Sequence, residues 1–211
     1  MTRRIGWNLA VALAAVALGM PAKAGTTDVS LLLGGKSLTD DHLDEAGIST
    51  GFQCGVRSTL DFDWPVALAL DVLVASEDAV QDYSDGFPLK IETAARTMEI
   101  HFGVRRYFLD EKPVRPYVGG GLSIAQLKVR QVQSGSFGPG TEYANEVAND
   151  TSTDLGYWLG GGFGWFIHQV VLGADVRWSN ASADISPNGS SGSVSLDSGG
   201  VQYALFVGYS W

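Results

Sequence analysis

Eight ionisable residues recur at alternate positions within apolar or glycine-rich stretches, and their types and spacing could support chemistry. Both signs of charge are represented in near balance, and charges removed from water are tolerated only when partnered. The pattern therefore favours ion pairs that fill an interior. A sharper alternative is that Glu99 and His101, two positions apart, act as a general acid/base pair. The set comprises Lys36, Arg57, Asp71, Glu99, His101, Arg105, Asp175 and Arg177.

Two acidic stretches have a composition that could bind a divalent cation. The first surrounds His42, and the second includes Asp82. Neither has the preorganised ligand spacing of a calcium loop, so solvated acidic loops are the favoured interpretation and no dedicated metal site is expected. The carboxylates are Asp40, Asp41 and Asp44 in the first stretch, and Glu77, Asp78, Asp82 and Asp85 in the second.

A glycine cluster at Gly160, Gly162 and Gly164 has the spacing of a dinucleotide-binding fingerprint. That fingerprint requires a following helix, whereas here Trp165 to Ile167 continue a strand pattern. Glycines within a strand leave space for large side chains from neighbouring strands. No cofactor is therefore expected.

The last stretch, 200–211, shows which elements would position the charged residues. Val201, Tyr203, Leu205, Val207, Tyr209 and Trp211 alternate with mostly small or polar residues, and Phe206 is the one large apolar residue of the second set. A period of two with one apolar face indicates a strand.

Seven further segments read as strands in the same way, and the gaps between them alternate in length. Short turns at one end and long loops at the other predict an antiparallel up-and-down arrangement with the long loops outside the cell. With the last stretch included, the segments are about 28–36, 48–57, 66–75, 97–108, 116–128, 154–167, 170–179 and 200–211. The expected long loops are 37–47, 76–96, 129–153 and 180–199.

The first 24 residues have the form of a secretory signal peptide. Arg3 and Arg4 precede an apolar stretch from Leu9 to Met20, and Ala22-Lys23-Ala24 forms a cleavage site. Removal of three cations would change the net charge from −9 to −12, which makes nucleic acid an unsuitable partner. The expected organisation is a signal peptide, 1–24, and one domain, 25–211. The one cysteine, Cys54, is interpreted as a small apolar residue.

The chain resembles the small outer-membrane β-barrels of the OmpA, OmpX, OmpW and opacity-protein type. The resemblance lies in the terminal Tyr209-Ser210-Trp211, the strand start Pro116-Tyr117-Val118-Gly119-Gly120-Gly121 and the signal peptide. It implies an all-β fold, an eight-stranded antiparallel up-and-down transmembrane β-barrel in the outer membrane of a Gram-negative bacterium. It also implies that Tyr203, Leu205, Val207, Tyr209 and Trp211 form the signal read by the barrel-assembly machinery.

By the same resemblance we expect a non-enzymatic protein of envelope integrity, surface interaction or adhesion. The implied partners are outer-membrane lipid and lipopolysaccharide and the barrel-assembly machinery, with divalent cations at the acidic loops, and a monomer is expected. An OmpW-like passage for small hydrophobic molecules is an alternative.

An enzymatic alternative rests on Trp178-Ser179-Asn180-Ala181, which resembles part of the His-x-Ser-Asn signature of outer-membrane lipid A deacylases. That resemblance would make Ser179 a nucleophile. The histidine expected two residues earlier is replaced by Arg177, which stays protonated and cannot act as a base. We therefore interpret the motif as a chance match and expect no catalytic residues.

Overall fold

The computed structural model describes residues 27–38, 50–62, 64–83, 89–109, 112–136, 142–185 and 194–211. The predicted signal peptide, the acidic residues around His42 and Asp85 lie outside these ranges. Within them, no helix has the length and apolar character needed to cross a bilayer.

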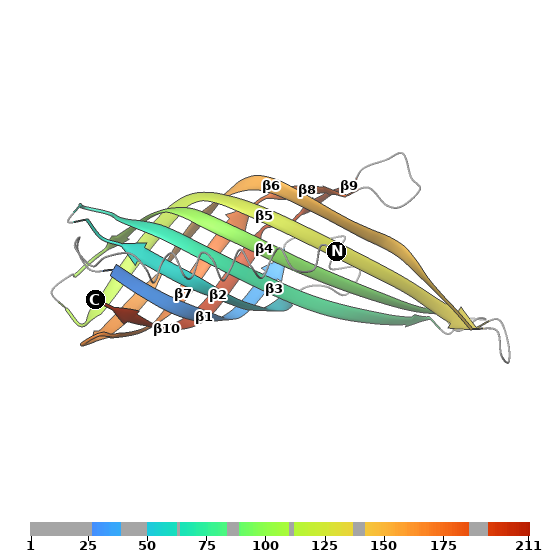
Figure 1. The fold of residues 1–211 in the computed structure, drawn as a ribbon, viewed down its shortest axis with the longest axis horizontal. Helices are drawn as coiled ribbons and strands as arrows, with labels where there is room; N and C mark the ends of the chain where they lie inside the picture. Colours follow the sequence, from blue (N-terminus) through green and yellow to red (C-terminus); the bar gives the residue numbers. More distant parts are fainter. Residues whose placement is uncertain are drawn as a thin grey trace.

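Eight antiparallel strands form a closed barrel in the order β1-β10-β7-β6-β5-β4-β3-β2 (Figure 1), which confirms the predicted fold class. A small separate sheet pairs β8 (Ser182–Ile185) with β9 (Val194–Asp197). The barrel strands are β1 (Thr27–Leu38), β2 (Thr50–Leu60), β3 (Ala67–Tyr83), β4 (Leu89–Tyr107), β5 (Val114–Ser136), β6 (Glu142–Ile167), β7 (Val170–Asn180) and β10 (Gly200–Ser210).

The alternation of residue types corresponds to the two faces of the barrel wall. On β10, the apolar side chains from Val201 to Tyr209 at every second position are between 45% and 70% exposed, whereas Gln202 and Phe206 are buried. The outer face is therefore suited to lipid and the inner face to a packed interior. Phe206, which breaks the apolar/polar alternation, lies inside.

The strands are strongly staggered around the barrel. A path through paired residues that starts at Asp28 returns to β1 at Leu38, and 38 − 28 gives a stagger of ten residues. Such a stagger tilts the strands by about 40° and leaves an interior that side chains can fill. The path passes through Thr59, Ala69, Gly103, Gly121, Trp158, Ser179 and Gly200.

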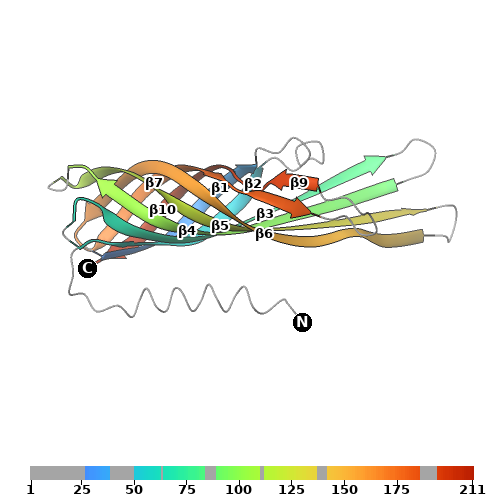
Figure 2. The ribbon, with the colours of Figure 1, turned by 90° about the horizontal axis from the view of Figure 1, so that it is seen from above.

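Four strands continue well beyond the rest of the barrel. The pairing of β2 with β3 ends at Ser76, and the pairing of β7 with β6 ends at Tyr157. Beyond these points β3, β4, β5 and β6 pair only with one another and form a projecting four-stranded sheet, which we call the blade (Figures 1 and 2). The blade comprises β3 from Glu77 to Tyr83, β4 from Leu89 to Ala95, β6 from Glu142 to Gly156, and the part of β5 that pairs with these residues.

The blade corrects two of the predicted long loops. Most of 76–96 and 129–153 is strand, and Glu77 and Asp78 lie on β3. The content of Gly, Ser, Asp, Asn and Glu in these stretches is typical of loops, and it predicts loops here. A strand outside the membrane can be polar on both faces, since its backbone pairs with neighbouring strands whatever its side chains. In the loop 180–199, the structure likewise adds β8 and β9.

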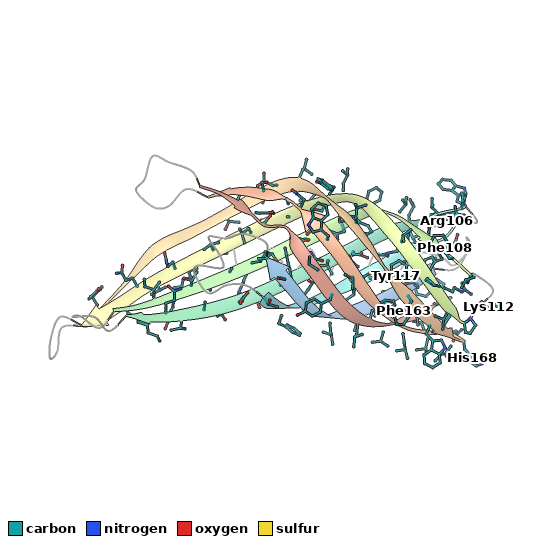
Figure 3. All side chains as sticks on the ribbon, turned by 180° about the vertical axis from the view of Figure 1, so that it is seen from behind. Arg106, Phe108, Lys112, Tyr117, Phe163 and His168 are labelled. Carbon is teal, nitrogen blue, oxygen red and sulfur yellow. The ribbon has the colours of Figure 1, made fainter. Side chains whose placement is uncertain are left out.

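The opposite end of the barrel has short connections. Arg106, Phe108, Lys112 and His168 all lie at this end (Figure 3). Only two residues join β6 to β7, and the first, His168, has a φ of 57°. Histidine is one of the non-glycine residues that adopt this left-handed region most readily. The link after β2 is shorter than predicted, because β2 continues to Leu60.

Two apolar clusters lie inside the barrel wall. The larger contains Leu32, Leu73, Tyr117, Val171, Ala204 and Phe206. The smaller joins Ala95 and Leu127 to Leu38, Ala79 and Val129 at the blade end.

Candidate functional site in the barrel interior

All eight charged residues singled out by their alternation are buried, with exposed fractions of 4% or less. They come from five strands, β1, β2, β3, β4 and β7. Each occupies the inward parity of its strand, so the closure of the barrel brings together residues far apart in the sequence. Their contacts form three connected groups.

The first group centres on Asp71 of β3. Its carboxylate accepts hydrogen bonds from Arg105 of β4 and from Nη1 of Arg177, the latter at 2.6 Å. Arg105 also donates through Nη1 to Oγ1 of Thr59 at 3.0 Å. Arg177 donates through Nε to Oδ1 of Asp175 at 2.6 Å. Two guanidinium groups therefore neutralise one solvent-excluded carboxylate, and one of them extends to a second carboxylate.

The second group surrounds Arg57 of β2. Its guanidinium donates to the Tyr117 hydroxyl at 2.6 Å and to the Tyr107 hydroxyl at 2.7 Å. Tyr117 in turn donates to the Asp175 carboxylate, which lies 3.8 Å from Nη1 of Arg57. The Arg57 guanidinium carbon also lies 4.3 Å from the centre of the Phe206 ring, a cation–π contact. The inward Phe206 thus supports the charged network.

The third group centres on Glu99 of β4. Its carboxylate forms an ion pair with Lys36 and accepts a hydrogen bond from the Gln202 amide at 2.7 Å. Nε2 of His101 lies 2.7 Å from Oε2 of Glu99, and Nδ1 of His101 lies 3.3 Å from Nη1 of Arg177. His101 therefore links this group to the first.

The geometry of His101 bears on the acid/base alternative. Both ring nitrogens have protein partners, and the ring stacks on Trp158 with centroids 5.5 Å apart and an interplanar angle of 8°. A general acid or base must reach a substrate atom. The partners of His101 occupy the positions through which a proton would be exchanged, so the arrangement is suited to holding charge in place.

Ser179 of β7 is also inside the wall, with an exposed fraction of 2%. Its hydroxyl oxygen accepts a hydrogen bond from the Gln202 amide nitrogen at 3.3 Å. An amide donor cannot remove the hydroxyl proton, as an activated serine requires. No cluster of three or more His, Cys, Asp or Glu residues suited to a metal ion occurs within the described ranges.

Inward glycines leave the space that the network occupies. A Cβ at Gly160 would lie 2.7 Å from the Arg177 Cβ, and one at Gly162 would lie 2.8 Å from the Tyr117 hydroxyl oxygen. A Cβ at Gly119 would lie 3.0 Å from the Arg105 Cγ. The glycine cluster therefore lies opposite the bulky members of the network.

Several members of the network were not among the residues selected from the sequence. Tyr117, Trp158 and Gln202 all contact selected residues. Asp28 is a further buried carboxylate, 3% exposed, and it accepts a hydrogen bond from Ser30. The only sequence signal that identifies each of these residues is its position on the inward-facing side of its strand. An alternation of charged residues does not reveal Tyr117, Trp158 and Gln202, because these side chains carry no charge at neutral pH. Asp28 stands at the start of the first predicted strand, before the alternation is established.

The residues of the expected assembly signal occupy the outer face of β10 and its end. Tyr203, Leu205, Val207 and Tyr209 are exposed, and the Tyr209 and Trp211 rings lie 5.9 Å apart. The chain end is also tied to β1, because the Trp211 amide donates to the Thr27 carbonyl at 3.0 Å.

Solved structures share this architecture. The outer membrane protein OprG from Pseudomonas aeruginosa is 15% identical, with a TM-score of 0.59 over 90% of this chain and 97% of the other. A major outer membrane protein from Thermus thermophilus is 13% identical, with a TM-score of 0.50 over 88% of this chain and 98% of the other. At these identities the likeness shows the fold alone.

No curated protein matches the chain. A family model described as "Outer membrane protein beta-barrel domain" matches residues 10–196. This match covers most of the chain, and the protein belongs to the outer-membrane β-barrel family that the model describes.

Proposed function

We propose that this protein is a non-enzymatic outer-membrane barrel with a filled lumen, and that it acts in envelope integrity, surface interaction or adhesion. The observation that carries the proposal is the buried network centred on Asp71, Arg177 and Glu99. Its members reach across the lumen from several strands and bind one another. A barrel of eight strands has room inside for such side chains and little else.

The network also argues against the alternative of a passage for small hydrophobic molecules. Such a molecule would have to cross a layer of charged groups whose hydrogen bonds are made within the protein. Displacing one partner would leave a buried charge uncompensated, at a cost of about 3 to 5 kcal/mol.

The arrangement around Ser179 supports a non-enzymatic role. Its hydrogen-bond partner is the Gln202 amide, and Arg177 is engaged with two carboxylates. Neither residue can serve as the base that a serine nucleophile needs.

The proposed setting follows the sequence expectations. The signal peptide is removed, the barrel is assembled by the barrel-assembly machinery, and the monomer lies among outer-membrane lipid and lipopolysaccharide without nucleic acid. The short turns face the periplasm and the blade faces the exterior, which is the usual asymmetry of these barrels.

Conductance across planar bilayers tests the filled lumen. We expect the refolded mature wild type to show no steady open-channel current. The paired truncation of Asp71 and Arg105 to Ala removes a central ion pair and should introduce current steps. Steady ohmic current through the wild type would contradict the proposal and favour a hydrated conduit.

Mass spectrometry of lipid A tests the absence of enzymatic activity. Cells that produce the wild type, the Ser179→Ala variant or no barrel should contain lipid A with the same acyl chains. A deacylation performed by the wild type and lost in Ser179→Ala would establish the enzyme instead.

A further inference from the structure

Two cations face each other on the outer surface of the barrel. Arg96 of β4 is the direct cross-strand partner of Lys128 of β5. Both are exposed, and both share the outward parity of their strands. Opposed side chains on one face have Cβ atoms about 5 Å apart, and like charges at such positions destabilise a sheet.

Within the described ranges, neither Arg96 nor Lys128 forms an ion pair with a protein carboxylate. By strand register, the nearest carboxylate on that face is Asp78 of β3. Asp78 is paired with Ala94, the outward residue of β4 next to Arg96. The Arg96 and Lys128 pair therefore places two adjacent positive charges on the surface of a chain whose formal net charge is −9.

The position of the pair relative to the apolar band indicates what it meets. On β4 the outward residues between Arg96 and Arg106 are Met98, Ile100, Phe102 and Val104. Ten residues rise about 33 Å along a strand, and a tilt of about 40° reduces this to about 25 Å along the barrel axis. That is the height of the apolar band of an outer-membrane barrel. Arg96 and Lys128 therefore lie at the boundary of the hydrocarbon region on the blade side.

We propose that Arg96 and Lys128 together bind a phosphate group on the sugar headgroup of an outer-leaflet phosphoglycolipid, the lipid A part of lipopolysaccharide. A phosphate between the two cations would replace their repulsion with two charge-assisted contacts. The outward, hydroxyl-bearing Ser76 flanks the pair as the cross-strand partner of Arg96 on β3. Below the pair, the exposed Ile124 and Leu155 offer a surface for acyl chains. The proposal rests on the orientation proposed above, in which the blade faces the cell exterior. It does not depend on whether the lumen is filled.

Native mass spectrometry of the folded mature barrel can test this site. The probes are bisphosphorylated lipid A, the same lipid enzymatically dephosphorylated, and inorganic phosphate. Near an anionic surface each basic residue contributes about a factor of five in affinity, so the double variant Arg96→Gln/Lys128→Gln should bind bisphosphorylated lipid A about 30-fold more weakly. Lys128→Arg should keep the wild-type affinity.

Arg106→Gln is the matched control, because Arg106 is an exposed, outward cation of the same strand at the opposite end of the apolar band. It should leave lipid A binding unchanged. Heat-modifiable migration of every variant establishes that it is folded. The proposal would be overturned if Arg106→Gln lost as much lipid A affinity as the double variant. It would also be overturned if the wild type bound dephosphorylated lipid A as tightly as the bisphosphorylated form, or if the wild type and the double variant retained inorganic phosphate equally.

Discussion

At the scale of single residues, the interior depends on how completely each charge is compensated. Asp71 has no exposed surface and accepts hydrogen bonds from two arginines. Exposed ion pairs, such as that between Lys90 and Glu92, are screened by water and contribute little. Burial alone therefore distinguishes the carboxylates that should matter for stability from those that should not.

Replacement of Asp71 by Leu should lower the free energy of unfolding by about 3 to 5 kcal/mol, because Arg105 and Arg177 lose a shared partner in the interior. Chemical unfolding in lipid vesicles, followed by tryptophan fluorescence, measures this change. Asp78→Leu is the control, since Asp78 is an exposed carboxylate of the same strand. Equal effects of the two substitutions would show that the network does not stabilise the barrel.

Alternation in the sequence was enough to select the charged residues of the interior but not their neutral partners. Asp71, Glu99 and Asp175 stand out because a charge within an apolar alternation requires an explanation. Tyr117 and Trp158 do not stand out in the sequence, because an aromatic residue suits either face of a barrel strand. Which acid meets which base depends on the ten-residue stagger, and that stagger is a property of the closed barrel.

At the scale of elements, β3 to β6 contain two regions with different requirements. Within the barrel, each strand needs one face for lipid and one for the interior. In the blade both faces can be polar, so period-two hydrophobicity disappears although strand pairing continues from Glu77 to Tyr83. Sequence periodicity therefore detected the membrane part of each strand and missed its continuation.

Shortening the blade tests whether it is separate from barrel stability. Residues 78–94 would be replaced by Asn-Gly, which joins the paired residues Glu77 and Ala95 through a two-residue turn. We expect the variant to assemble and to retain its heat-modifiable band, because Asp71 and Glu99 lie outside the deleted segment. Loss of the folded band would show that the barrel needs the blade.

The terminal strand offers a second test at this scale. Trp211→Asp should sharply lower the amount of protein in the outer membrane while signal removal continues, if the outward aromatic end of β10 is read during assembly. Trp64→Asp is the control, because Trp64 is a highly exposed aromatic residue between β2 and β3, at the same short-turn end of the barrel. Immunoblots of fractionated membranes report both amounts. A similar loss in both variants would indicate a general effect of aromatic residues at the membrane interface.

At the scale of the whole molecule, closure joins the two ends of the described chain. β1 and β10 pair along their full lengths from Asp28↔Ser210 to Leu38↔Gly200. Every barrel strand therefore has two neighbours in the membrane region, and no edge is left unpaired there. The seam between β1 and β10 is as essential to this closure as any hairpin, although its strands are the furthest apart in sequence.

This closure predicts that the purified protein resists SDS until it is heated, so that unboiled and boiled samples migrate differently on a gel. Leu31→Pro should abolish the difference, because Leu31 is paired with both β10 and β2, and proline removes a backbone donor from the middle of a strand. Val80→Pro is the matched control: Val80 lies in the blade and, among the described residues, pairs only with Glu92. It should keep the heat-modifiable band. Two results would contradict this prediction: identical migration of boiled and unboiled wild type, or a normal folded band for Leu31→Pro. Either would mean that the continuous backbone pairing of β1 with its two neighbours does not stabilise the closed barrel.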